Sequence, residues 1–300
     1  MEDTLNSPIE GQTMIESCGD FHGAESGAPR AGFNGVLQDA PGESTAIAHG
    51  LSQQLVHQMN LISDSILVSF DDLNVDLGDA VFPLVQAPAK AALQAAIQER
   101  GIKLSINSAY RTLAQQMLLY NWYNGKSAVA PPGASNHQSG LAIDIEDPQG
   151  WLPYLERYGW QWLGDFDPPH FDYVGEGTQD IRSMAIQAFQ KLWNKNHPDE
   201  QIDEGGEFGP QTEDKLNRAP VLGFAKAPWD DNPRILRLSR PRMEGSDVLK
   251  LQEKLKTAGF TVDLDGEFGP GTDKAVKELQ QQKSLTADGI VGPKTLTAIA

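Results

Sequence analysis

A short motif that occurs three times in the C-terminal half of the chain constrains the fold more than any other feature. The segment "GGEFGPQTEDKL" (205–216) recurs as "DGEFGPGTDKAV" (265–276), and a half-copy, "DGIVGPKTLTAI", occupies 288–299. Each copy contains Gly-Pro shortly before a threonine, which is typical of a helix start because glycine turns the chain and proline presets φ. Repetition on this scale predicts small stacked helical units, so we expect an all-α region after residue 177.

The residues before this region mix helical and strand patterns. Apolar residues at helical spacing predict helices, and alternating apolar and polar residues predict half-buried strands. The expected elements are helices at 45–66, 87–101 and 112–124, and strands at 102–110, 140–146 and 170–174. Residues 67–86 look irregular. Because helices and strands interleave without a regular βαβ rhythm, we predict an α+β domain with a small antiparallel sheet.

Composition divides the chain further. Residues 1–80 contain 13 Asp and Glu residues against one basic residue, Arg30, and the first part of this acidic stretch is predicted to be disordered. Residues 219–243 hold four prolines, which is typical of a linker. The predicted segments are an acidic tail at 1–45, the α+β domain at 46–177, a degenerate repeat at 178–222, a linker at 223–242 and a second repeat region at 243–300.

Net charge and hydropathy argue against several classes of protein. A formal net charge of −17 disfavours nucleic acid as a partner, because a phosphate backbone needs a positive surface. No stretch approaches the ~18 apolar residues that span a membrane. Cys18 is the single cysteine, which excludes an internal disulfide. A monomer is the default expectation.

The segment "SNHQSGLAIDIE" contains a histidine and a carboxylate that could hold a metal. In the strand predicted there, Gly140, Ala142 and Asp144 share one face, and the small residues leave room for an ion. His137 can fold back over the same space. A lone His and Asp pair is more often structural, but His170 opens the next predicted strand and could add a third ligand. Two His and one Asp would leave a fourth tetrahedral position for water, as in catalytic zinc sites.

A carboxylate for proton transfer is expected next to such a site. Asp167 lies three residues before His170, across a Pro-Pro pair. Polyproline II has ~3 residues per turn, so the two side chains would point the same way, which makes Asp167 the candidate general base. The competing carboxylates are Asp165, Asp172 and, less strongly, Glu146.

Arg111 stands at a predicted junction between a strand and a helix. It follows the strand expected at 102–110 and precedes Thr112, a candidate N-cap. A guanidinium at this position could form a bidentate pair with a carboxylate. An exposed arginine near a helix start is the commoner explanation, but the helix dipole slightly disfavours arginine there, which hints at a specific role.

Four segments together resemble a known family. "SAYRT", "VAPPGASNHQSGLAIDI", "YGWQW" and "DPPHFDYVG" have the order and spacing of the zinc D-alanyl-D-alanine carboxypeptidases and their L-alanyl-D-glutamate endopeptidase relatives. The family pattern Ser-x-His-x-x-Gly-x-Ala-x-Asp is complete from Ser135 to Asp144, and the resemblance covers about residues 87–175. The C-terminal repeats resemble peptidoglycan-binding modules, the copy at 243–300 more closely than the copy at 178–222.

The resemblance implies a cofactor and a role for each site residue. The implied ligands of Zn2+ are His137, Asp144 and His170. Asp167 would be the catalytic base. Arg111 would bind the substrate's carboxylate, and Ser135 would orient the substrate or the intermediate by hydrogen bonding.

The resemblance also implies a zinc metallopeptidase that hydrolyses peptidoglycan stem peptides. Removal of terminal D-Ala is the leading hypothesis. Asp167 stands where carboxypeptidases usually have Glu and endopeptidases have Asp, so cleavage between L-Ala and D-Glu is the alternative. A non-catalytic wall-binding protein and a structural zinc domain are further alternatives, and the complete ligand set with its open fourth position disfavours both.

This function implies a place at the cell wall, in the periplasm or outside the cell, with peptidoglycan as the partner. The first residues show neither the basic nor the apolar region of a secretory signal. We therefore expect an unconventional export route, a misassigned start of the chain, or release by lysis proteins, as for phage endolysins.

Overall fold

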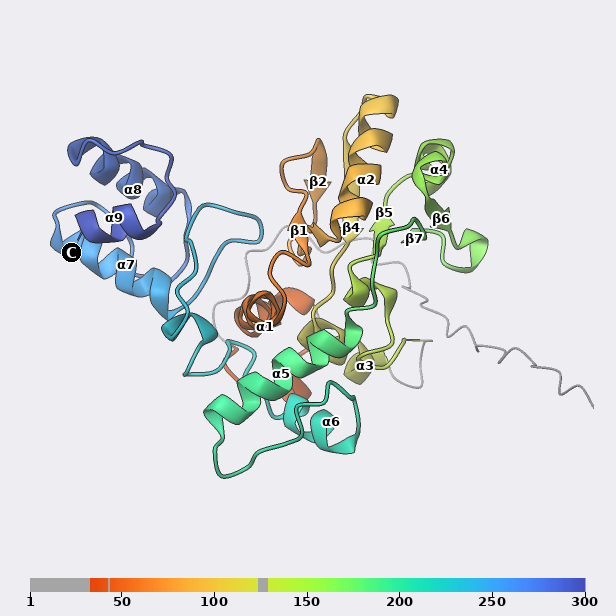
Figure 1. Ribbon diagram of the computed structural model, residues 1–300, viewed down its shortest axis with the longest axis horizontal. Coiled ribbons are helices and arrows are strands. Elements are labelled where there is room, and N and C mark those ends of the chain that lie inside the picture. The colour runs from red at the N-terminus through yellow and green to blue at the C-terminus, as the bar shows by residue number, and fades with distance from the viewer. Residues whose placement is uncertain (1–32, 43, 124–128, 300) are drawn as a thin grey trace, which may run out of the picture.

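The computed structural model describes residues 33–42, 44–123 and 129–299 (Figure 1). The helices are α1 (His49–Ile62), α2 (Ala87–Arg100), α3 (Leu113–Tyr123), α4 (Pro148–Leu155), α5 (Arg182–Asn196), α6 (Pro210–Asn217), α7 (Ser246–Thr257), α8 (Pro270–Gln282) and α9 (Pro293–Ala298). The strands are β1 (Val68–Ser69), β2 (Val75–Leu77), β3 (Leu84–Val85), β4 (Leu104–Ser108), β5 (Ala142–Ile145), β6 (Trp160–Trp162) and β7 (His170–Tyr173). Among the described residues, no helix combines the length and the apolar character needed to cross a membrane. Cys18 and most of the predicted acidic tail lie outside the described residues.

Five strands form the main sheet, in the order β2-β4-β5-β7-β6. Strand β2 runs parallel to β4, whereas the other neighbours are antiparallel. The predicted antiparallel sheet is therefore wrong in one pair, and the sheet is mixed. The sequence predicts neither β2 nor β6, because three-residue strands are too short to show a period of two.

The period of the strands gives the sheet two chemically different faces. Ile143 of β5 pairs with Phe171 of β7, and both side chains lie in an apolar core with residues of α2 and α4. The next pair along the two strands is Asp144 with His170, whose side chains point to the opposite face. The same two strands therefore support a hydrophobic core on one side and a polar site on the other.

A second core is built by helices that are distant in the sequence. Helices α1, α3 and α5 bury Leu55, Met117 and Phe189 against one another, together with residues of α6. Leu37 is fully buried in this core, so the disorder expected for the N-terminal tail does not extend to residues 33–42. The segment that contains the first repeat thus shares a core with α1, which precedes the sheet, and with α3, which lies between β4 and β5.

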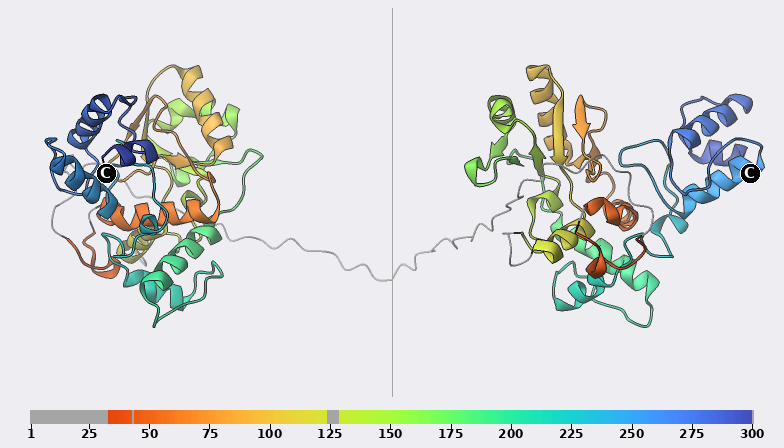
Figure 2. Two further views of the ribbon diagram at one scale, coloured as in Figure 1. Left: turned by 60° about the vertical axis from the view of Figure 1, so that its left-hand side comes forward. Right: turned by 180° about the vertical axis from the view of Figure 1, so that it is seen from behind.

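The C-terminal helices enclose a core of their own. Helices α7 and α8 bury apolar residues together with Leu236 and Val291, and the chain ends in the short helix α9. In Figure 1 and in the view from behind in Figure 2, this group (blue) stands at one side of the molecule, next to α1. The helical region expected at the C-terminal end is confirmed.

A glutamine side chain makes the same pair of hydrogen bonds to each of the three copies of the repeated motif. Its Oε1 accepts a hydrogen bond from a glycine N–H, and its Nε2 donates to a threonine hydroxyl. The sets are Gln190 with Gly206 and Thr212, Gln252 with Gly266 and Thr272, and Gln280 with Gly289 and Thr295. All three glycines lie at positive φ, between 72° and 77°, a conformation that residues with a side chain rarely adopt. The repeat therefore encodes one local structure three times.

Candidate metal centre

His137 is held by a short turn that its sequence motif encodes. It lies in the 3₁₀ helix η3 (Asn136–Ser139), and its backbone N–H donates to Ser135 Oγ at 3.3 Å. Gly140 ends the turn in the left-handed conformation (φ 68°), where a side chain would be strained and would collide with Leu67. Ser135 is fully buried. The hydroxyl that the resemblance assigns to the substrate thus caps the turn that carries His137.

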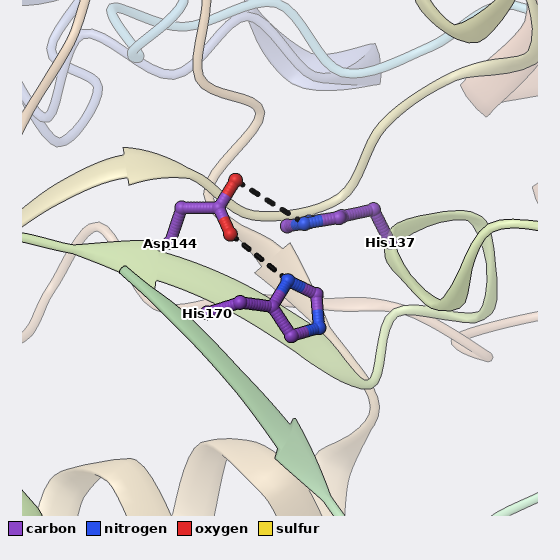
Figure 3. Close-up of side chains that lie close together, drawn as sticks. All are labelled: His137, Asp144 and His170. Carbon is purple, nitrogen blue, oxygen red and sulfur yellow. Dashed lines mark hydrogen bonds and ion pairs between the residues drawn. The ribbon is translucent and has the colours of Figure 1, made fainter. Parts of the chain in front are cut away.

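The register of the strands brings two further side chains to His137. Asp144 of β5 and His170 of β7 lie directly opposite each other. Asp144 Oδ1 is 3.0 Å from His170 Nδ1, and Asp144 Oδ2 is 3.3 Å from His137 Nε2 (Figure 3). All three side chains are buried, and one possible ligand atom from each lies within 4.8 Å of the others. In the part of the chain that the structure describes, these residues form the one group of His, Cys, Asp or Glu side chains that could hold a metal ion.

Hydrogen bonds around the group select which ring nitrogen of each histidine faces it. His137 Nδ1 lies 2.8 Å from the carbonyl oxygen of Ala109, so Nε2 faces Asp144. His170 is turned the other way, because Nδ1 faces Asp144 and Nε2 lies 3.0 Å from Asp172 Oδ1. Two imidazole nitrogens and a carboxylate are ligands that zinc prefers, so the donor set fits this metal.

The ionised forms of Asp144 and His170 stabilise each other. Burial would raise the pKa of Asp144, but the charges of His137 and His170 and the hydrogen bonds with them hold it well below its usual value. Burial likewise opposes protonation of His170, yet its hydrogen bonds with Asp144 and Asp172 raise its pKa well above the usual value. Asp144 is therefore a buried anion, which favours a cation at this position.

Arg111 lies in the same site, at the predicted junction. Thr112 and Gln115 cap α3 reciprocally, since each backbone N–H donates to the other's side-chain oxygen, at 3.1 and 3.2 Å. The Arg111 side chain is buried, with Nη2 3.5 Å from Asp144 Oδ2 and Nη1 donating to Gln116 Oε1 at 3.1 Å. Its burial excludes the interpretation of Arg111 as an ordinary exposed residue at a helix start.

Asp167 is buried in the turn that leads into β7. The N–H of His170 donates to the Asp167 carbonyl oxygen at 3.1 Å. Trp162 Nε1 donates to the Pro168 carbonyl oxygen at 2.7 Å, which ties the turn to β6. Asp167 is 1% exposed, and both of its carboxylate oxygens are buried. The turn thus holds a buried carboxylate immediately before a candidate metal ligand.

The carboxylates that compete with Asp167 lie differently. Asp165 and Glu146 are exposed, whereas Asp172 contacts the His170 ring. Sequence reasoning treats Asp172 as a competing base and misses this contact, although residues two apart in a strand share a face. The other histidines of the described chain lie elsewhere, namely His49 and His57 in α1 and His197 at the end of α5.

Two protein-family models match separate regions of the chain. Residues 85–163 match the family model described as D-alanyl-D-alanine carboxypeptidase, and residues 244–299 match a peptidoglycan binding domain. The resemblance stated from the sequence motifs is thereby confirmed. The first match includes His137 and Asp144 but ends before His170.

The curated relatives are similar over part of their length. The N-acetylmuramoyl-L-alanine amidase CwlL of Bacillus licheniformis is 33% identical over 137 residues, which are 41% of this chain and 36% of the relative. The N-acetylmuramoyl-L-alanine amidase CwlM of Mycobacterium tuberculosis is 45% identical over 56 residues, 18% of this chain and 14% of the relative. A spore cortex-lytic enzyme of Bacillus cereus is 46% identical over 52 residues, 17% of this chain and 20% of the relative. The chain therefore spans well under half the length of these relatives.

Proposed function

We propose that this chain is a zinc-dependent peptidase that removes terminal D-Ala from peptidoglycan stem peptides. One observation carries the proposal: His137, Asp144 and His170 are buried together in a chain that matches a D-alanyl-D-alanine carboxypeptidase model and a peptidoglycan-binding model. A protein that only binds the wall has no need of three such side chains in one buried group. The names of the relatives, amidases and a cortex-lytic enzyme, support wall hydrolysis as the setting.

Each side chain has a role that its position supports. Bound zinc would supply a Lewis acid that acidifies a water molecule and polarises the scissile carbonyl. Asp167, buried just before His170, takes the proton of the attacking water and delivers it to the leaving amine. Arg111, 3.5 Å from Asp144, binds the free terminal carboxylate of the stem and positions the scissile bond. Ser135 orients the turn that carries His137.

Cleavage between L-Ala and D-Glu is the second candidate. It is favoured by the identity of residue 167, which is Asp as in the endopeptidases that this chain resembles. The carboxypeptidase is preferred because residues 85–163 match the carboxypeptidase model and because a buried arginine beside the site suits a terminal carboxylate.

Mass spectrometry of the products from a defined muropeptide with a pentapeptide stem tests the proposal. With added Zn2+, we expect free D-Ala and a stem one residue shorter. New D-Glu N-termini together with muramyl-L-Ala would instead select the endopeptidase. Absence of any cleavage by the zinc-loaded protein would overturn both.

Two matched variants identify the base in the same assay. Asp167→Asn removes the proposed base and should lower kcat by roughly 10²–10⁴-fold. Asp165→Asn makes the same change two residues away at an exposed carboxylate and should leave kcat unchanged. An equal loss in both variants, or none in Asp167→Asn, contradicts the assignment.

The C-terminal module, residues 243–300, has a separate role in this proposal. It binds peptidoglycan and raises the local concentration of the catalytic site at the wall. This role places the protein at the cell wall, in the periplasm or outside the cell, and a monomer suffices for it.

A further inference from the structure

Asp172 lies against the His170 ring on the edge that faces away from Asp144. His170 and Asp172 are two residues apart in β7, so their side chains share a face of the sheet. Asp172 Oδ1 is 3.0 Å from His170 Nε2, and Nδ1 of the same ring is 3.0 Å from Asp144 Oδ1. The imidazole therefore bridges two carboxylates, one inside the candidate metal group and one outside it.

A second contact holds Asp172 in place. Asn136 Nδ2 donates to both Asp172 carboxylate oxygens, at 3.1 and 3.2 Å. Asn136 is the first residue of η3, the turn that carries His137. The Asp172 side chain is 19% exposed, so it is shielded but not sealed from water. One carboxylate thus links the turn and the strand that supply two of the three candidate ligands.

We propose that Asp172 is a positioning residue that keeps the proton of His170 on Nε2 and so presents Nδ1 to the metal. The inference rests on the proposed zinc site and deepens it. A neutral imidazole has one lone pair, and the hydrogen bond made by one nitrogen decides which nitrogen is left to bind metal. A hydrogen bond from Nε2 to a carboxylate also makes Nδ1 of the same ring a stronger ligand for the metal.

The two histidines differ in a way that makes Asp172 testable. The ring of His137 is oriented by the Ala109 carbonyl oxygen at 2.8 Å, a backbone group that no side-chain substitution removes. The ring of His170 is oriented by a side chain. A change at residue 172 therefore removes the hydrogen-bond acceptor of the His170 ring and leaves the acceptor of the His137 ring in place.

Zinc affinity, measured by competition with a chromophoric chelator, is the first test. Asp172→Ala should weaken zinc binding by roughly 10–100-fold. Asp172→Asn keeps an oxygen that can accept from Nε2 and should restore most of the affinity. Asn136→Ala should lie between the two. Glu176→Ala removes a carboxylate from an exposed position four residues further on and should bind zinc as the unaltered protein does.

Nitrogen-15 NMR of the histidine rings is the second test, and a merely structural role would not move it. In the zinc-loaded protein, His170 should coordinate through Nδ1 and carry its proton on Nε2. In zinc-free Asp172→Ala, only Nδ1 keeps a carboxylate acceptor, Asp144 Oδ1 at 3.0 Å, so the proton should move from Nε2 to Nδ1. Thermal unfolding of each zinc-free variant shows whether it folds.

The outcomes separate this inference from the function on which it rests. Unchanged zinc affinity in Asp172→Ala, or coordination of His170 through Nε2, overturns the role of Asp172 and leaves the zinc site standing. Failure of the unaltered protein to bind one zinc ion overturns both. If Asp172→Ala does not fold, Asn136→Ala provides the test, because it removes the residue that holds the Asp172 carboxylate. Unaltered zinc affinity and unaltered protonation of the His170 ring in Asn136→Ala would then contradict the role of Asp172.

Discussion

The first repeat and the C-terminal module share a motif but differ in what they pack against. Gln190 and Gln252 close their turns with the same hydrogen bonds. Yet Phe189 of α5 is buried in the core shared with α1 and α3, whereas Phe268 is buried in the separate core of the C-terminal helices. The motif therefore determines a local turn, while the apolar residues around it determine which core the repeat joins.

The first repeat also reaches the candidate metal centre. Arg182 at the start of α5 donates from Nη1 to the Ala134 carbonyl oxygen at 3.2 Å. A Cβ added at Gly133 would come within 2.8 Å of Ile186 Cδ1, so α5 also packs closely on the chain before Ser135. The repeat at 178–222 therefore contacts the loop that leads to His137, and it also shares a core with α1 and α3.

The largest effect should come from removing one buried phenylalanine in each region. Phe189→Ala and Phe268→Ala each delete a fully buried ring and should cost about 3–5 kcal/mol of local stability. Only Phe189→Ala should also lower zinc affinity and peptide cleavage, because its core supports the site. Calorimetry with a cleavage assay checks this. Equal loss of cleavage in both variants would mean that the two cores unfold as one.

Deletion of residues 241–300 should separate tethering from catalysis. We expect cleavage of soluble stem peptides to persist, while activity on whole sacculi falls by about 100-fold as the local concentration is lost. Release of products from both substrates is the measurement. A parallel fall on both substrates would refute the tether.

A smaller effect is expected where α1 contacts the C-terminal part of the chain. Gln53 of α1 donates to the Arg242 carbonyl oxygen at 2.6 Å and accepts from the Glu244 N–H at 2.8 Å and from Arg234 Nη1 at 3.0 Å. Gln53→Ala should weaken this contact by about 1–3 kcal/mol, because buried polar groups lose their partners.

Limited proteolysis between residues 223 and 242 measures this loosening. Cleavage should be faster in Gln53→Ala, with soluble peptide hydrolysis unchanged. Gln98→Ala, at an exposed position of α2, is the matched control. Unaltered proteolysis in Gln53→Ala would mean that the packing of residues 223–242, and not this contact, holds the module in place.

The smallest effect should be a pH dependence at the same contact. Burial, with the charge of Glu267, raises the pKa of Glu244 to about 7 from 4.5. The folded protein therefore favours the protonated carboxyl, and stability is lost as pH rises from about 4.5 to about 7. Glu244→Gln should increase stability by ~1 kcal/mol at pH 8 and should have no effect near pH 4.

Melting temperatures of both proteins between pH 4 and pH 8 check this sign. His49 Nδ1 lies 4.0 Å from Glu244 Oε1, but burial lowers the pKa of His49 to about 4, so the ring is neutral in both proteins above about pH 6. A difference that does not change with pH would show that Glu244 does not titrate at this contact.

Local patterns predict most of the elements that carry the candidate site. Helix α2 and strands β5 and β7 lie within the ranges expected at 87–101, 140–146 and 170–174, because a helical or strand period is a property of neighbouring residues. Strand β2 and its parallel pairing with β4 are not predictable in this way. The pairing depends on contacts between separate segments, and three residues carry too little pattern.

The residue types of the candidate metal group, and the faces on which they stand, can be read from the sequence alone. His137 precedes a glycine turn, and the strand period places Asp144 on the face opposite Ile143. The burial of Arg111 beside Asp144, the contact of Asp172 with His170 and the packing of the first repeat on α1 appear only once the chain is folded. These features depend on which distant segments share a core, and no local period encodes that choice.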